Sequence, residues 1–242
     1  MADPHFEIPR LAEVYDPFDP DRSDLEAYST VVDELGARRV LDVGCGTGTS
    51  ACMFASRGKD VIGLGPAGAS LDVARKKPGA DGVTWVRGDL GALSASHVDL
   101  ATMTGNVAQI FVADDEWATT LRACHRALRP GGHLVFESRV PEDQAWLRWT
   151  RGATYTRALL VDVGPVEYWV EVTGVRGDIV SFRSTYIFES DGATYTSDST
   201  LRFRSRAQIE SSLREADFAV IDVRDAPDRP GREFVFMARR AG

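Results

Sequence analysis

A carboxylate stands two residues before a run of alternating glycines in the stretch VLDVGCGTGTS, residues 40–50. Asp42 comes first, and Gly44, Gly46 and Gly48 follow at G-x-G-x-G spacing. Glycine permits positive φ and a close approach of backbone to ligand, so this loop predicts a binding surface. A dinucleotide site uses G-x-G-x-x-G and aims a helix N-terminus at a diphosphate. The carboxylate of Asp42 would repel a diphosphate and attract the ammonium group of an amino-acid tail.

These residues resemble the first motif of the class I S-adenosylmethionine (SAM)-dependent methyltransferases, (D/E)-x-G-x-G-x-G at the end of the first strand. The resemblance implies an α/β fold with a Rossmann-like doubly wound sheet of seven strands, mostly parallel with the last strand antiparallel. It also implies that SAM is the cofactor and that Asp42 lies near its amino group. An ordinary glycine-rich turn after a buried strand is the alternative. The loop residues expected to bind SAM are Gly44, Cys45, Gly46, Thr47 and Gly48.

The composition narrows the range of partners. Lys and Arg total 28 against 36 Asp and Glu, a net charge of -8, which disfavours nucleic acid as a partner. Three cysteines without metal-ligand spacing favour a reducing cytoplasm and no metal site. Neither an apolar leader nor an apolar run long enough to span a bilayer is visible, so we expect a cytoplasmic protein that does not enter the membrane.

Alternating helix and strand patterns extend from residue 23 to residue 139. Ser23 and Glu26 are spaced as a capping box, which predicts a helix that ends near Gly36. Buried strands and helices alternate after it. Strands are expected at 40–43, 61–64, 83–86 and 98–103, with a fifth that ends at Glu137 and Ser138, and helices at 49–57 and 114–128.

The second strand ends at Gly65, where the family has an Asp or Glu that accepts hydrogen bonds from the ribose hydroxyls. Asp60 cannot replace this acid, because it lies at the other end of the strand, about 15 Å away at ~3.3 Å per residue. A lost charge-assisted hydrogen bond costs about 1.5–3 kcal/mol, so weakened SAM binding is expected. Gly65 and Pro66 remain predicted cofactor residues because of their place at the strand end.

Two more groups of cofactor residues follow neighbouring strands. Asp89 and Leu90 follow the third strand, where the family places an acidic or amide residue beside the adenine; a plain turn is the alternative for Asp89. Thr104, Gly105 and Asn106 follow the fourth strand, at the crevice of a doubly wound sheet. The D/N-P-P-Y/F motif of amino-methylating DNA enzymes is absent at this point.

The first 22 residues are rich in Asp and Pro but contain the run VYDPFDP. Many small-molecule methyltransferases fold an N-terminal segment with a Tyr over SAM, so the resemblance implies that residues 1–22 form a lid and that Tyr15 covers the cofactor. Packing of Tyr15 on the domain is the alternative. A lid predicts that removal of residues 1–18 leaves the melting temperature nearly unchanged.

After Arg139 the pattern changes to β-hairpins. Residues 140–204 predict an antiparallel meander inserted into the SAM-binding domain, which consists of 23–139 and 205–242. Such sheets resemble those of glycine and amino-sugar N-methyltransferases, where they line the acceptor pocket or form a subunit interface, so a homodimer through this sheet is one expectation. The meander strands are expected at 155–161, 166–173, 179–189 and 194–203, followed by a helix at 208–216 and strands at 218–223 and 234–239.

Candidate acceptor residues are Arg139, Trp146, Trp149 and Tyr168, with packing in the core as the alternative for the aromatic ones. Methyl transfer mainly requires alignment of the nucleophile and exclusion of water. Glu137 is the acid nearest the expected reaction edge, and it is the candidate base for an amine or else orients the acceptor.

The sequence therefore predicts SAM-dependent methyl transfer to a nitrogen or oxygen atom of a small-molecule acceptor. A non-catalytic relative with a weakened SAM site is the first alternative, because the ribose acid is missing at Gly65. An NADP-dependent oxidoreductase is the second. Both the glycine spacing and Asp42 disfavour it, and no Arg directly follows Gly65 to bind a 2′-phosphate.

Overall fold

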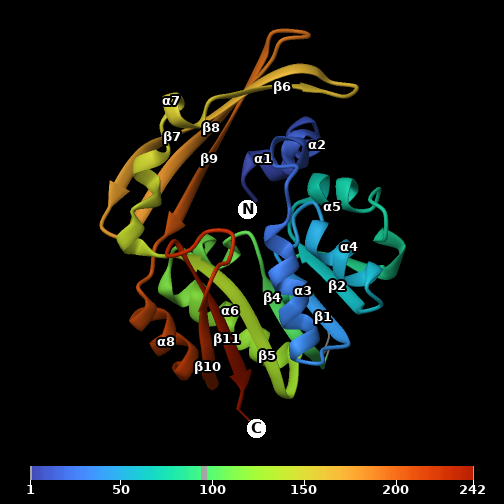
Figure 1. The fold of residues 1–242 in the computed structure, drawn as a ribbon, viewed down its shortest axis with the longest axis vertical. Coiled ribbons are helices and arrows are strands. Elements are labelled where there is room, and N and C mark those ends of the chain that lie inside the picture. Colours follow the sequence, from blue (N-terminus) through green and yellow to red (C-terminus); the bar gives the residue numbers. More distant parts are fainter. Residues whose placement is uncertain (1, 94–96, 242) are drawn as a thin grey trace.

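The computed structural model describes residues 2–93 and 97–241, so positions 1 and 242, the outer limits of the predicted segments, lie outside the described residues. Its strands form a seven-stranded sheet of order β10-β11-β5-β4-β1-β2-β3 and a four-stranded sheet of order β6-β7-β8-β9 (Figure 1). The large sheet contains β1 (Arg39–Val43), β2 (Asp60–Gly65), β3 (Val83–Arg87), β4 (Val98–Met103), β5 (Leu128–Arg139), β10 (Phe218–Asp225) and β11 (Glu233–Arg240). The small sheet contains β6 (Thr156–Leu160), β7 (Gly164–Arg176), β8 (Ile179–Phe188) and β9 (Ala193–Arg202).

The large sheet has the predicted mixture of directions. Strands β3, β2, β1, β4 and β5 run parallel, whereas β11 is antiparallel to both β5 and β10. Val40 and Leu41 of β1 are fully buried, as expected for a parallel strand covered on both faces. The sequence prediction of a doubly wound sheet with an antiparallel last strand and an inserted meander is confirmed.

Helices cover both faces of the large sheet. The helices are α1 (Pro4–Glu7), α2 (Pro9–Phe18), α3 (Asp24–Glu34), α4 (Thr49–Ser56), α5 (Gly68–Ala74), α6 (Asp114–Ala127), α7 (Arg151–Thr154) and α8 (Arg206–Glu215). Leu25 and Val32 of α3 and Phe54 of α4 pack in one core cluster on the sheet. Leu121 of α6 and Leu213 of α8 pack in another. The candidate ligand site lies at the carboxyl ends of the parallel strands.

The predicted capping box at the start of α3 is wrong. Ser23 has helical backbone angles and its side chain makes no cap hydrogen bond. Instead the carboxylate of Asp21 accepts the Ser23 N–H at 3.0 Å, because Asp readily bonds the backbone two residues on. A capping box does form at the start of α8, between Ser205 and Gln208.

The N-terminal segment is helical and packs on the rest of the chain, while its role as a lid over the cofactor stays a prediction. Leu11 and Val14 of α2 are fully buried in a cluster with Val166 and Phe188 of the small sheet. Helices α1 and α2 lie between the small sheet and α5 (Figure 1). Removal of residues 1–18 would expose this cluster, so we now expect it to lower the melting temperature, contrary to the sequence-based expectation.

Candidate functional site

The glycine loop lies where the order of the strands reverses direction. The chain proceeds from β1 outward to β2 and β3 and then returns to β4 on the other side of β1, which places a crevice at the carboxyl ends of β1 and β4. Gly44 has φ +73° and Gly48 has φ +78°. A Cβ at Gly48 would lie 2.5 Å from Trp85 Cη2, and one at Gly44 would lie 2.8 Å from Val107 Cγ1. Both positions therefore require glycine.

Asp42 is buried at the end of β1 with one oxygen unpaired. Thr102 Oγ1 donates to Asp42 Oδ1 at 3.2 Å, whereas Oδ2 has no partner among the described residues. Burial raises the pKa of Asp42 to about 7. A buried carboxylate oxygen without a donor is costly, and a ligand ammonium group would supply both the donor and the opposite charge. The site thus fits the amino group of SAM at the predicted residue.

Thr47 in the glycine loop is held by the N-terminal segment. Thr47 Oγ1 donates to Asp16 Oδ1 at 2.7 Å, and Lys77 Nζ pairs with Asp16 Oδ2 at 2.6 Å. Tyr15, next to Asp16, is half-buried against Phe6 and His5, with ring centroids 5.3 and 5.7 Å apart. Burial raises the pKa of Tyr15. The structure therefore brings α2 onto the glycine loop through Asp16, while a contact of Tyr15 with the cofactor stays a prediction.

The ends of β2 and β3 adjoin the loop. A Cβ at Gly65 would lie 3.4 Å from Cys45 Sγ, an ordinary contact, so position 65 faces the loop with room for a side chain. Gly88 N donates to Gly65 O at 3.0 Å, which places Asp89 at the same edge. Asp89 Oδ1 accepts Gly91 N at 2.8 Å and caps a short turn. Roles in cofactor binding for Pro66, Asp89 and Leu90 stay predictions.

Two buried glutamates, Glu137 of β5 and Glu233 of β11, lie beside Asn106, which follows β4. Asn106 links them: its backbone N–H donates to Glu137 Oε1 at 2.9 Å, and its Nδ2 donates to Glu233 Oε1 at 3.0 Å. The hydroxyl of Tyr28, on α3, donates to Glu137 Oε2. Burial and, secondly, the charge of Glu233 raise the pKa of Glu137. A raised pKa makes a carboxylate in this setting a stronger proton acceptor than an ordinary glutamate.

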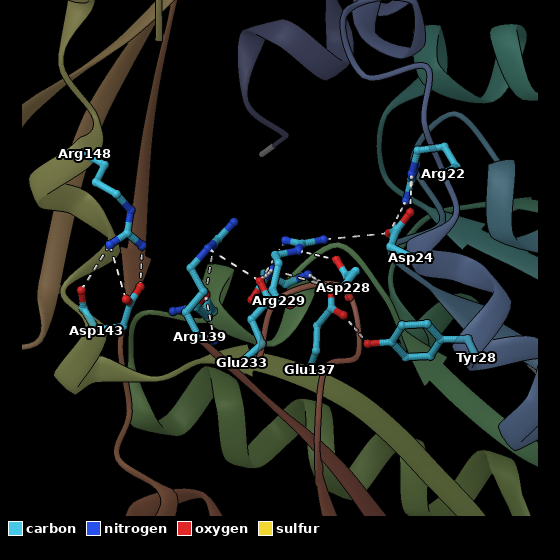
Figure 2. Close-up of polar contacts among 12 residues, drawn as sticks. Arg22, Asp24, Tyr28, Glu137, Arg139, Asp143, Arg148, Asp228, Arg229 and Glu233 are labelled. Carbon is cyan, nitrogen blue, oxygen red and sulfur yellow. Dashed lines mark hydrogen bonds and ion pairs between the residues drawn. The ribbon is translucent and has the colours of Figure 1, made fainter. Parts of the chain in front are cut away.

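Two arginines share this cluster. Arg229 Nη1 bonds Glu233 Oε1 at 2.9 Å, and Arg139 Nε lies 3.9 Å from the same oxygen (Figure 2). Glu233 Oε2 is buried without a partner among the described residues, as is Asn106 Oδ1. Asn106 also has φ 61°, a left-handed conformation that is strained for a side chain. Unpaired buried oxygens and local strain are typical of a ligand site.

The structure separates the four predicted acceptor residues. The Arg139 guanidinium lies 5.5 Å from the Trp149 ring, so these two meet beside Glu233. Trp146 packs on Phe203, with centroids 4.6 Å apart, in the core under the small sheet. Tyr168 stacks near Tyr186 at 4.8 Å in the cluster that buries α2. Trp149 also packs on Phe182, with centroids 4.9 Å apart, so core packing describes all three aromatic residues. Acceptor binding by any of the four residues stays a prediction.

Thr104 and Gly105 complete the predicted edge. Thr104 Oγ1 is 2.9 Å from Ser50 Oγ of α4, and Gly105 has φ +70° with open space around it. Sequence reasoning did not single out several residues of the assembled site, because only tertiary contacts place them there: Asp16, Tyr28, Arg229 and Glu233. The available signals were weak, namely an acid next to Tyr15 and an acid at the start of the last strand.

The strand order, the glycine loop at the strand reversal and the inserted sheet define the fold of the SAM-dependent methyltransferases. Residues 40–132 are similar to the family described as a methyltransferase domain. A ubiquinone biosynthesis O-methyltransferase of Pectobacterium carotovorum subsp. carotovorum (strain PC1) is 30% identical over 154 residues, 59% of this chain and 64% of that relative. The chain thus matches less than two thirds of that relative's length.

Solved structures share the fold over nearly the whole chain. A SAM-dependent methyltransferase from Clostridium acetobutylicum superposes with a TM-score of 0.75 at 17% identity, covering 96% of this chain and 98% of the other. An amino pentose methyltransferase from Micromonospora echinaspora, with SAM bound, has a TM-score of 0.70 at 24% identity, covering 92% and 93%. Within residues 2–93 and 97–241, no helix is long and apolar enough to cross a membrane and no group of side chains is arranged to hold a metal ion.

Proposed function

We propose that this chain transfers a methyl group from SAM to a nitrogen atom of a small-molecule amine. One observation supports the proposal most directly: the glycine loop follows β1, and Asn106, which bonds Glu137 of β5, follows the neighbouring strand β4 at the same edge of the sheet. The loop and Asp42 fit the amino-acid end of the cofactor. The buried glutamates fit a cationic acceptor beside it, because an ammonium group would satisfy the unpaired oxygen of Glu233.

The side chains have separable tasks in this reaction. SAM, when bound, supplies an activated methyl group on a positively charged sulfur. Asp42 holds the ammonium group of the cofactor. Glu137 receives the proton that the acceptor ammonium must lose before its nitrogen can attack, since a raised pKa makes the Glu137 carboxylate a stronger proton acceptor than an ordinary glutamate. Tyr28 and Asn106 fix the orientation of that carboxylate by hydrogen bonds.

The test is a SAM-turnover assay with paired acceptors that differ only in carrying an amine or a hydroxyl group. We expect the amine of each pair to be methylated, and Glu137→Gln to lower kcat by about 10²- to 10⁴-fold. The affinity for S-adenosylhomocysteine (SAH) should stay within about twofold, because Glu137 acts on the acceptor. Methylation of hydroxyl acceptors alone would refute the amine, and absence of SAH binding to the unmodified protein would refute the whole proposal.

A non-catalytic binding protein is the second candidate, since Gly65 removes the expected ribose acid. Tight SAH binding without turnover of any acceptor would favour it. An NADP-dependent oxidoreductase has less support: Arg87 does lie at this strand end, but it pairs with Glu7 at 2.9 Å. A 2′-phosphate would have to compete with that carboxylate.

The remaining parts of the proposal concern partners and location. Net charge -8 supports a small molecule over nucleic acid as the acceptor. Three buried free thiols, those of Cys45, Cys52 and Cys124, support a reducing cytoplasm. The small sheet supports a homodimer through its exposed edge, because two large apolar side chains, Leu159 and Val161, are 79% and 87% exposed there.

A further inference from the structure

The end of β2 lacks its own acid but has one supplied from the N-terminus. Glu7, the last residue of α1, lies at the turn that follows Gly65. Glu7 Oε2 accepts the Gly68 N–H at 2.9 Å, and Glu7 Oε1 accepts from Arg87 Nη2 at 2.9 Å. Arg87 belongs to β3 and is paired with Gly65 in the strand register. A carboxylate is therefore fixed at the strand end whose last residue is Gly65.

The local sequence is adapted to receive this carboxylate. The residue before α5 is Ala67, whose side chain cannot cap the helix, and the Glu7 carboxylate bonds the first N–H in its place. A Cβ at Gly68 would lie 2.8 Å from Arg87 Cζ, so glycine makes room for the pair. The Ser70 hydroxyl donates to Phe6 O at 2.8 Å and fixes the backbone beside Glu7.

The carboxylate retains the capacity to bind a ligand. Among the described residues each oxygen accepts one hydrogen bond, and a carboxylate oxygen has two lone pairs, so each has one acceptor position left. The Glu7 side chain is 42% exposed, so a ligand can reach it. Its existing donors are a backbone N–H and a guanidinium group, and a carboxylate also accepts strong hydrogen bonds from hydroxyl groups.

We propose that Glu7 supplies the ribose-binding carboxylate that Gly65 lacks, by accepting hydrogen bonds from the ribose hydroxyls of SAM and SAH. This inference rests on the proposed function. It makes the cofactor site dependent on the N-terminal segment, because Glu7 reaches β2 only while α1 and α2 are packed between the small sheet and α5. It also replaces the expectation of weakened SAM binding, since the acid is present from another part of the chain.

The experiment measures Kd by isothermal titration calorimetry with two probes, SAH and its 2′,3′-dideoxyribose analogue. Glu7→Gln should weaken SAH binding by about ten- to a hundred-fold, the usual effect of losing a charge-assisted hydrogen bond. Binding of the dideoxy analogue should be unchanged, since it has no hydroxyl for Glu7 to accept. Glu13→Gln, at an exposed position on α2, is the matched control and should leave both Kd values unchanged.

A second variant distinguishes ribose binding by Glu7 from a purely structural role of Glu7 in fixing the N-terminal segment. Gly65 is not at positive φ and its Cβ position is free, so Gly65→Asp can place an acid at the strand end. We expect Gly65→Asp to restore SAH binding to Glu7→Gln, but to improve the unmodified protein by less than about threefold, because its ribose is already bound.

Each other outcome has a distinct meaning. Equal weakening of SAH and the dideoxy analogue by Glu7→Gln would overturn the inference, since it would show only a loosened N-terminal segment. Unchanged SAH binding in Glu7→Gln would also overturn it, while leaving SAM as the cofactor. If the unmodified protein binds neither probe, the proposed function fails first, independently of Glu7.

Discussion

Asp42 is a residue whose fitness for binding a ligand lowers the stability of the ligand-free protein. The group has a pKa of about 7 in the folded protein, above its ordinary value of 3.8, because burial disfavours the charged form. For an acid with a raised folded pKa, the folded state is favoured at low pH. Stability is lost as the pH rises from about 4 toward 7, where the carboxylate ionises without a donor for Oδ2. The cationic end of a ligand would offset this loss.

Asp42→Asn should therefore change stability and affinity in opposite directions. At pH 8 the melting temperature of the ligand-free variant should rise by several degrees, because about 1 kcal/mol corresponds to about 2–4 °C in a chain of this size. SAH binding should weaken by about tenfold or more, because the charged partner of its ammonium group is gone. Scanning fluorimetry and calorimetry measure the two effects. A fall in both stability and affinity would show that Asp42 is a structural residue.

The same residue predicts a pH profile for cofactor binding. SAH binding requires ionised Asp42, so the affinity of the unmodified protein should fall as the pH drops below about 7, by up to about tenfold per unit. Titrations between pH 8 and pH 6 test this. Asp42→Asn should lack the added slope, and an identical slope in both proteins would assign it to another group.

At the scale of elements, the sequence predicted what is determined locally. Strands such as β4 were found at their actual bounds because a buried parallel strand is a continuous apolar run, and the glycine loop was found because its positive φ angles require glycine. The contacts of Glu7 with Gly68 and of Asn106 with Glu233 join residues 61 and 127 positions apart. No local pattern encodes such pairs. The helical packing of the N-terminus was missed for the same reason.

Helix α2 should contribute to the stability of the whole chain. Leu11 is fully buried against the small sheet, so Leu11→Ala should cost about 2–5 kcal/mol and lower the melting temperature by roughly 5 °C or more. Calorimetry of the ligand-free protein measures this. Glu13→Ala, on the exposed face of the same helix, is the control and should have little effect. An unchanged melting temperature in Leu11→Ala would show that packing of α2 does not stabilise the rest of the chain.

At the scale of the molecule, the small sheet has an edge that the chain itself leaves uncovered. Strand β6 pairs only with β7 among the described residues, and Leu159 and Val161 are 79% and 87% exposed on or just after it. An exposed apolar edge strand is a template for pairing with another chain. A two-fold symmetric contact between two copies would cover both β6 edges at once, because each copy uses the same surface to contact the other.

We therefore expect the protein to be a dimer in solution through β6. Light scattering after size-exclusion chromatography should give twice the mass of 26.5 kDa for the unmodified chain and 26.5 kDa for a Leu159→Glu, Val161→Glu double variant. The charges would repel across the two-fold axis and would cost desolvation if buried. SAH affinity should be unchanged in the variant, because the side chains of Leu159 and Val161 are exposed, whereas Glu7 and Asp16 contact the turn after β2 and the glycine loop. A monomeric unmodified protein, or a double variant that remains dimeric, would exclude β6 as the interface.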